Sequence, residues 1–207
     1  MVDGRSGNVV QISQGSAVLD YDIFLNLEVA DSQELFRSDA NSGLYGLIRQ
    51  AANSRTNPDA LPISLTKTVV AQGRWKGEYI GLTCAACHTA QLTYRGKKIR
   101  IDGGVANTFD LMAYIHALDD ALQATLTDTA KFNRLAVRLG ASTSNAKIEL
   151  RNRFASEAER AHESHLGRVN SSEPKMGSLT IRPGLILASD RLVRTMGASF
   201  PIVEKEV

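Results

Sequence analysis

Residues 81–90 read GLTCAACHTA, and this stretch contains both cysteines of the 207-residue chain. Cys84 and Cys87 are separated by two residues, and His88 directly follows the second cysteine. Because the chain has no further cysteine, the pair cannot belong to a wider disulfide framework and must act locally. Three uses suit this spacing: a redox dithiol, part of a metal site, or a covalent tether for a large cofactor.

The pattern Cys84-Ala85-Ala86-Cys87-His88 predicts the attachment of one c-type haem. Two cysteines on one turn of chain reach the two vinyl groups at one edge of the macrocycle. The histidine after the second cysteine is then held beneath the iron as its proximal ligand. The small side chains of Ala85 and Ala86 allow the backbone and the porphyrin to approach closely.

Three other interpretations of the cysteine pair were weighed. A thioredoxin-like dithiol would follow a strand at the start of a helix within a βαβ unit, and that pattern is missing from the sequence. A structural zinc ion would need four ligands, and only His116, His162 and His165 remain to complete the set. The third interpretation is a pair of buried cysteines without a cofactor.

The second axial ligand of the iron is left open by the sequence. Met112 and His116 lie four residues apart in a predicted helix, whereas Met176 and Met196 lie in an irregular C-terminal region. Each of the four carries an atom that binds iron, although core packing is the simpler role for Met112. An empty position would leave the iron able to bind a diatomic ligand or peroxide.

Charge patterning gives weaker indications of partners. The formal net charge is +2, and no basic stripe or aromatic-basic ladder is present, so nucleic acid is not expected as a partner. A local basic cluster follows the motif and either stays solvated, pairs with haem propionates or contacts an acidic redox partner. Its members are Arg95, Lys97, Lys98 and Arg100.

The helical periodicity of the middle of the chain and the haem motif together predict a mainly α, cytochrome-c-like haem domain over residues 21–166. An irregular lead-in occupies residues 1–20, and an irregular or partly disordered tail occupies residues 167–207. A small β-hairpin is expected after the motif, around the turn at Gly96. Three helices follow, the first with an apolar stripe at Phe109, Met112, Ile115, Leu118 and Leu122.

Four stretches together resemble one protein family. They read LFRSD at residues 35–39, NPDALP at 57–62, YIGLTCAACHTAQ at 79–91 and YRGKKIRIDGG at 94–104. They are similar to the amino-terminal haem region of bacterial di-haem c-type cytochromes related to rubber oxygenases, which are distantly similar to di-haem cytochrome c peroxidases. The resemblance covers roughly residues 20–165.

The resemblance implies a mostly helical periplasmic or secreted protein. In that family the amino-terminal haem reacts with oxygen or peroxide, and a second haem relays electrons. Cys84, Cys87 and His88 match the first haem motif, but no third cysteine is present for the second. We therefore expect one haem at most, in a fragment or a single-haem derivative. Its partner is then a redox protein or a missing second haem domain.

Electron transfer by one covalent haem is the minimal function that these observations predict. The alternative is the truncated amino-terminal half of a di-haem oxygenase or peroxidase, and whether the chain is an enzyme stays open. The first residues, MVDGRSGNVVQ, lack a signal peptide, so we expect an export signal upstream. No apolar run approaches the length of about 18 residues that a membrane span needs.

Overall fold

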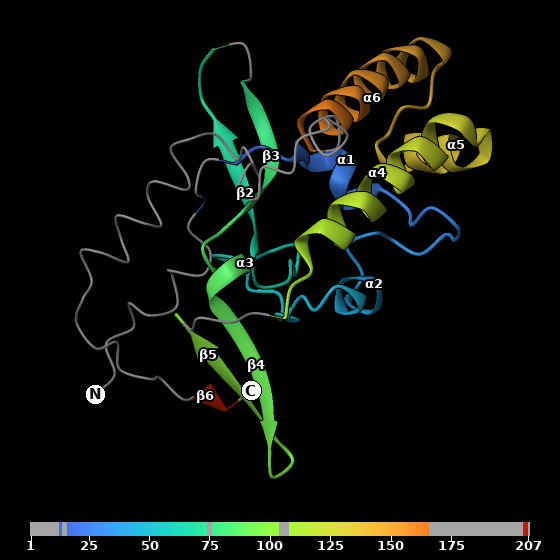
Figure 1. Ribbon diagram of the computed structural model, residues 1–207. Coiled ribbons are helices and arrows are strands. Elements are labelled where there is room, and N and C mark those ends of the chain that lie inside the picture. Colours follow the sequence, from blue (N-terminus) through green and yellow to red (C-terminus); the bar gives the residue numbers. More distant parts are fainter. Residues whose placement is uncertain (1–12, 14–15, 74–75, 104–107, 166–204, 207) are drawn as a thin grey trace, which may run out of the picture.

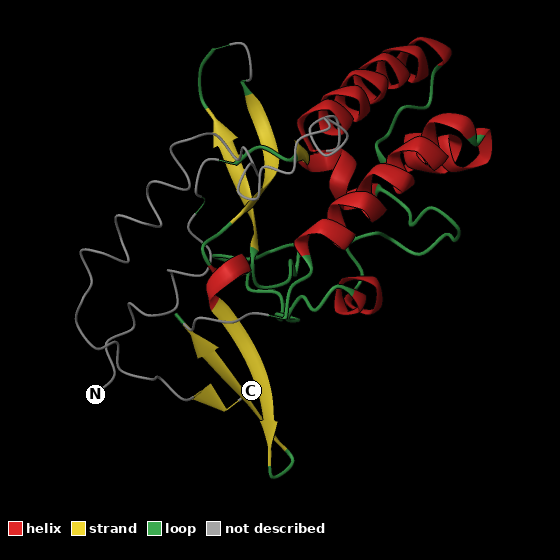
Figure 2. Cartoon of the chain, viewed as in Figure 1, coloured by secondary structure: helices red, strands yellow, loops and turns green. Residues whose placement is uncertain are grey.

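The computed structural model describes residues 13, 16–73, 76–103, 108–165 and 205–206. Helices and strands alternate along the first half of the chain, and helices dominate the second half (Figures 1 and 2). The elements are β1 (Leu19–Asp20), α1 (Tyr21–Asn26), α2 (Asp39–Leu44), β2 (Leu65–Val70), β3 (Gly77–Leu82), α3 (Ala85–His88), β4 (Thr89–Tyr94), β5 (Lys97–Asp102), α4 (Leu111–Thr127), α5 (Thr129–Arg138), α6 (Ser144–His165) and β6 (Lys205–Glu206).

The strands form two antiparallel sheets of three strands each, in the orders β1-β3-β2 and β4-β5-β6. The prediction of a mainly α, cytochrome-c-like fold is therefore wrong, and the described fold mixes α and β structure. The missed strand β2 buries Thr66 and Thr68 rather than alternating apolar with polar residues. Because threonine is β-branched it favours strands, although it carries no hydrophobic signal.

The predicted hairpin is confirmed as β4 and β5, which pair from Thr89 opposite Asp102 to Tyr94 opposite Lys97. Its two-residue turn has positive φ angles at Arg95 (50°) and Gly96 (79°). Positive φ at both central positions defines the type I′ turn, whose twist matches that of the flanking strands. The hairpin extends away from α4, α5 and α6 (Figures 1 and 2).

The three long helices α4, α5 and α6 form where the sequence predicts three helices after the hairpin. Phe109, the first residue of the predicted stripe, lies before α4, and Asp110 caps the helix by accepting a hydrogen bond from the backbone of Ala113 at 3.0 Å. Asp128 caps α5, and α5 ends before Gly140, which adopts a φ of 73°. A glycine with positive φ is the common stop signal after a helix.

The main core lies where α1, β3 and the helices α4 to α6 meet. Phe24, Phe36 and Phe154 are completely or almost completely buried in it. The ring centroids of Phe36 and Tyr114 are 5.2 Å apart, which is a favourable distance for aromatic packing. This core joins both halves of the described chain into one unit.

Helix α6 is also held to the first sheet by polar contacts. Arg160 donates to the backbone carbonyl of Ala17 at 3.1 Å, and Arg153 forms an ion pair with Asp20. Strand β1 occupies the last residues of the expected irregular lead-in, whereas residues 1–12 and most of the expected C-terminal tail lie outside the described residues. Among the described helices, none combines the length and the apolar character that crossing a bilayer requires.

Candidate functional site

The cysteine motif forms a single helical turn at the junction of the two sheets. Strand β3 leads into it, Cys84 is the N-cap residue of α3, and β4 begins directly after His88 (Figure 1). Residues at positions i, i+3 and i+4 share one side of a helical turn. Cys84, Cys87 and His88 have this spacing, so their side chains leave the turn on the same side.

The opposite side of α3 faces the protein interior. Ala85 and Ala86 are 4% and 3% exposed, and Ala85 packs in a small cluster with Ile63 and the partly buried Ile48. In contrast, Cys87 is exposed and Cys84 and His88 are partly buried. Both cysteines are free thiols. The alanines therefore anchor the turn, and the three chemically active side chains remain accessible from outside.

Hydrogen bonds on both flanks fix the turn. The backbone N–H of Thr83 donates to the carbonyl of Ser64 at 2.9 Å, and the Thr83 hydroxyl accepts from the backbone of Ala85 at 3.2 Å. Within the turn, the N–H of His88 donates to the carbonyl of Cys84 at 3.0 Å. Thr83 is 3% exposed, so its hydrogen bonds are shielded from water. The two cysteines and the histidine are thus presented on a braced backbone.

The base of the hairpin braces the other flank. The hydroxyl of Thr89 donates to Asp102 at 3.3 Å, and Arg100 forms an ion pair with the same carboxylate at 3.0 Å. Sequence reasoning missed the roles of Thr83, Thr89 and Asp102. A threonine immediately before a helical turn is a known capping signal and could have revealed Thr83. No comparable local signal marks Thr89 and Asp102.

The electrostatics of the cysteine pair argue against a thioredoxin-like dithiol. Although Cys87 is exposed as a residue, partial desolvation of its thiol raises the pKa, and the neighbouring Cys84 raises it further. Reactive cysteines of dithiol oxidoreductases have lowered pKa values, because the thiolate is the nucleophile. The chain also leaves α3 into a separate antiparallel sheet, rather than into a parallel strand of a βαβ unit.

A zinc ion and a haem would require different numbers of ligands from the motif. Among the described residues, no three side chains of His, Cys, Asp or Glu are gathered closely enough to hold a metal ion. A structural zinc ion would need four such ligands. In haem attachment the sulfur atoms bond to carbon, and only His88 of the motif would bind iron. The accessible pair of thiols beside one imidazole therefore fits a haem better than zinc.

The candidates for the second axial position lie on α4 or outside the described residues. Met112 is half-buried in the first turn of α4, and His116 is exposed one turn later. Helix α4 packs mainly against α5 and α6. Met176 and Met196 lie outside the described residues. Met112 and His116 thus share the first two turns of α4 but differ in exposure.

The basic cluster after the motif is divided by the hairpin. Arg95, Lys97 and Lys98 are exposed, whereas Arg100 is partly buried and pairs with Asp102 at 3.0 Å. In the paired strands, Lys98 and Arg100 lie on one face and Lys97 on the other. The basic cluster therefore consists of three exposed cations near the tip of the hairpin and of Arg100, which pairs within the hairpin.

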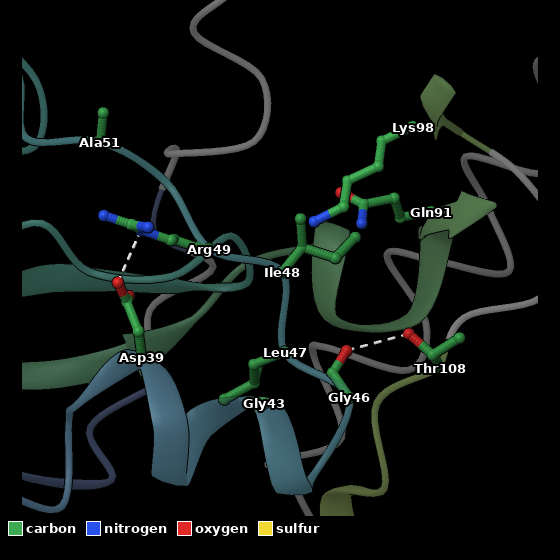
Figure 3. Close-up of a pocket in the computed structure, with 10 residues that line it drawn as sticks. All are labelled: Asp39, Gly43, Gly46, Leu47, Ile48, Arg49, Ala51, Gln91, Lys98 and Thr108. Carbon is green, nitrogen blue, oxygen red and sulfur yellow. Dashed lines mark hydrogen bonds and ion pairs between the residues drawn. The ribbon is translucent and has the colours of Figure 1, made fainter. Parts of the chain in front are cut away.

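A cavity of about 630 Å³ is lined by α2 and the segment after it, and by two residues of the hairpin (Figure 3). Its wall includes Ile48, which also packs against Ala85, and Gln91 and Lys98 from the hairpin. Arg49 and Asp39 form an ion pair at its edge, with an Nε–Oδ2 distance of 2.6 Å. The described wall contains none of the three motif side chains, so this cavity is separate from the face of the cysteines.

The comparisons with known proteins leave the family open. No protein-family model matches the chain, and no solved structure matches it. The chain is similar to an uncharacterized protein, y4iJ, of Sinorhizobium fredii (strain NBRC 101917 / NGR234), with 46% identity over 57 residues. The match spans 28% of this chain and only 9% of the relative, so it covers a small part of a much longer protein.

Proposed function

We propose that the chain binds one covalent haem c and transfers electrons. The observation that carries this proposal is the arrangement of α3, with Ala85 and Ala86 packed inward and the two cysteines and His88 accessible on the other side. A planar group bound to both thiols would lie against the accessible side of the turn. The absence of further cysteines in the chain supports a local role for the pair.

Each residue of the motif has a distinct role in this proposal. Cys84 and Cys87 would hold the haem through two thioether bonds, each made by adding a thiol S–H across one vinyl group. His88 would supply a ring nitrogen to the iron from the same turn. Thr83 and Thr89 position these side chains through the hydrogen bonds on both flanks. The bound haem supplies a reversible one-electron redox couple.

The proposal extends to the cellular setting and to the partner. Haem is attached to such motifs outside the cytoplasm, so a periplasmic or secreted location follows from it. The electron partner is then a separate redox protein or a second haem domain. The proposed location and the proposed electron partner both depend on haem attachment, and neither stands if no haem is attached.

Chemistry on oxygen or peroxide is the second candidate function. It rests on the resemblance of residues 79–104 to the first haem region of di-haem oxygenases and peroxidases. Carbon monoxide added to the reduced protein separates the two candidates. A rapid spectral change indicates an open or weakly held position, whereas no change supports electron transfer through a six-coordinate iron.

Haem attachment is tested by producing the whole chain in a periplasm that matures c-type cytochromes. After reduction, the visible absorption spectrum of the protein should show the sharp bands of a haem c. The haem should also stay bound to the polypeptide after denaturation. The variant His116→Ala serves as a control, because an exposed side chain on α4 should not affect attachment. A colourless product from wild type under conditions that mature a known c-type cytochrome would refute the proposal.

A further inference from the structure

The tip of the β4–β5 hairpin, residues 92–98, exposes apolar and cationic side chains together. Leu92 is 43% exposed and Tyr94 is 57% exposed, which is unusual for large apolar groups on a paired strand. Arg95, Lys97 and Lys98 are exposed beside them. The tip lies at the end of the molecule far from α4 to α6 (Figures 1 and 2).

The turn holds its arginine in a conformation that arginine does not favour. Arg95 adopts a φ of 50°, in the left-handed region where glycine, asparagine and aspartate are the usual residues. Its guanidinium lies over the ring of Tyr94, 5.2 Å from the ring centroid. A strained non-glycine residue at a projecting turn is a feature that clusters at binding sites. The apex thus keeps a cation and an aromatic ring together despite a conformational cost.

The two exposed apolar side chains lie on one face of the hairpin. Leu92 and Tyr94 are two residues apart in β4, and side chains at this spacing point to the same face of a strand. Ile99, which pairs with Leu92 across the ladder, continues this face in β5. The tip is therefore amphipathic: Lys97, which pairs with Tyr94, lies on the same face as Leu92 and Ile99, and this face ends at the turn with Arg95.

We propose that the hairpin tip binds the surface of a bilayer that contains anionic phospholipids. Lysine and arginine near such a surface are attracted by its negative potential. Tyrosine favours the level of the lipid headgroups, and a leucine beside it can enter the acyl boundary. This inference does not depend on haem attachment, because the motif residues take no part in it.

Size favours a lipid surface over an acidic protein as the occupant. A stable protein–protein interface uses about 20–30 residues on each side, whereas the tip offers the seven residues from 92 to 98. A projecting turn is also convex. A deformable lipid surface can bind a convex element, whereas a protein partner would need a groove of matching shape. Electrostatic attraction supplements the small apolar area on a bilayer, since the charge of the lipids is spread over the whole surface.

The test is flotation of the full chain with two kinds of vesicle. One consists of phosphatidylcholine alone, and the other also contains phosphatidylglycerol. We expect the chain to float with the anionic vesicles, to bind neutral vesicles much more weakly, and to dissociate as the salt concentration rises. Arg95→Asn should weaken binding about fivefold, because one cation is lost. Asparagine suits a type I′ turn, so this variant should keep the hairpin intact.

A second variant, Leu92→Thr with Tyr94→Thr, removes the apolar groups and keeps β-branched residues in the strand. We expect it to weaken binding by about tenfold or more, with an unchanged circular dichroism spectrum. The matched controls are Val137→Thr, a 73% exposed residue of α5, and Arg55→Asn, an exposed cation outside the hairpin; both should bind as wild type does. Equal binding by all variants would overturn the proposal. Binding to an immobilised polyglutamate peptide without binding to anionic vesicles would overturn it in favour of a protein partner.

Discussion

Arg134 donates two hydrogen bonds to the buried carboxylate of Glu28, from Nε to Oε1 at 2.8 Å and from Nη2 to Oε2 at 2.7 Å. Arg138 adds a third bond to Oε1 at 2.5 Å, and Lys131 lies 3.6 Å from Oε2. Glu28 is 3% exposed, so water contributes little to its solvation. This network fastens α5 to the segment after α1, and it thereby fixes the helical layer behind the first sheet.

Replacing the buried carboxylate should destabilise the fold. Glu28→Gln keeps the side-chain shape but removes the charge that faces three cations, and Lys131 is itself 7% exposed. We expect the free energy of unfolding to fall by about 3 kcal/mol, measured by urea denaturation. Glu78→Gln is the matched control, because Glu78 pairs with Lys67 at the surface, where such a pair contributes less than about 1 kcal/mol. Equal losses in the two variants would contradict the role of the Glu28 network.

The same network predicts how stability depends on pH. Burial alone would raise the pKa of Glu28, but hydrogen bonds and charge from Arg134 and Arg138 outweigh it and lower the pKa from 4.5 to about 2. A lowered pKa means that the stabilisation is fully present above pH 4.5 and is lost as the pH falls toward 2. The difference in unfolding free energy between wild type and Glu28→Gln should therefore shrink across this window. A constant difference would show that Glu28 does not titrate as described.

Two glycines offer a test of the packing around the first sheet. A Cβ atom at Gly81 would lie 2.2 Å from the Thr68 hydroxyl and 2.6 Å from the carbonyl of Ser16, whereas one at Gly43 would meet nothing within 4 Å. We expect Gly81→Ala to lower the free energy of unfolding by about 2 kcal/mol or more. Gly43→Ala, inside α2, should be neutral or slightly stabilising, because alanine favours helices. Equal effects would contradict the packing at β3.

The pH dependence of Cys87 alkylation distinguishes a haem tether from a redox-active dithiol. Partial desolvation, and then the neighbouring Cys84, raise the pKa of the Cys87 thiol above its ordinary value of 9.0. In the haem-free chain, the rate of alkylation of Cys87 by iodoacetamide should therefore be low at neutral pH and rise only in alkaline solution. The rate is followed by peptide mass spectrometry, which distinguishes Cys87 from Cys84. An alkylation midpoint below pH 7 would favour a redox dithiol.

The sequence predicted the helical half of the fold and the hairpin, because both carry strong local signals. The stripe from Met112 to Leu122 has helical spacing, and the Gly96 turn separates two alternating runs. The first sheet was missed because Thr66 and Thr68 are buried without being hydrophobic, and because β1 is only Leu19–Asp20. A two-residue strand is defined by its pairing with β3, which no local pattern records.

The candidate site was predictable only in part, for the same reason. The spacing of Cys84, Cys87 and His88 places them on one side of any helical turn. The packing of Ala85 against Ile63, and the bond from Thr83 to Ser64, join segments about twenty residues apart. Such contacts depend on the tertiary fold. The sequence therefore predicts which side chains of the motif are reactive, but not the packing and hydrogen bonds that hold the turn in place.

The central claim is tested most directly by counting the thioether bonds of the matured protein. The spectrum of its reduced pyridine complex in alkali depends on how many vinyl groups have been saturated. We predict a spectrum with both vinyl groups saturated for wild type, and one vinyl group free in Cys84→Ala and in Cys87→Ala. Full vinyl saturation in either single variant, or wild-type protein that carries zinc and no covalent haem after maturation in a competent periplasm, would contradict the account.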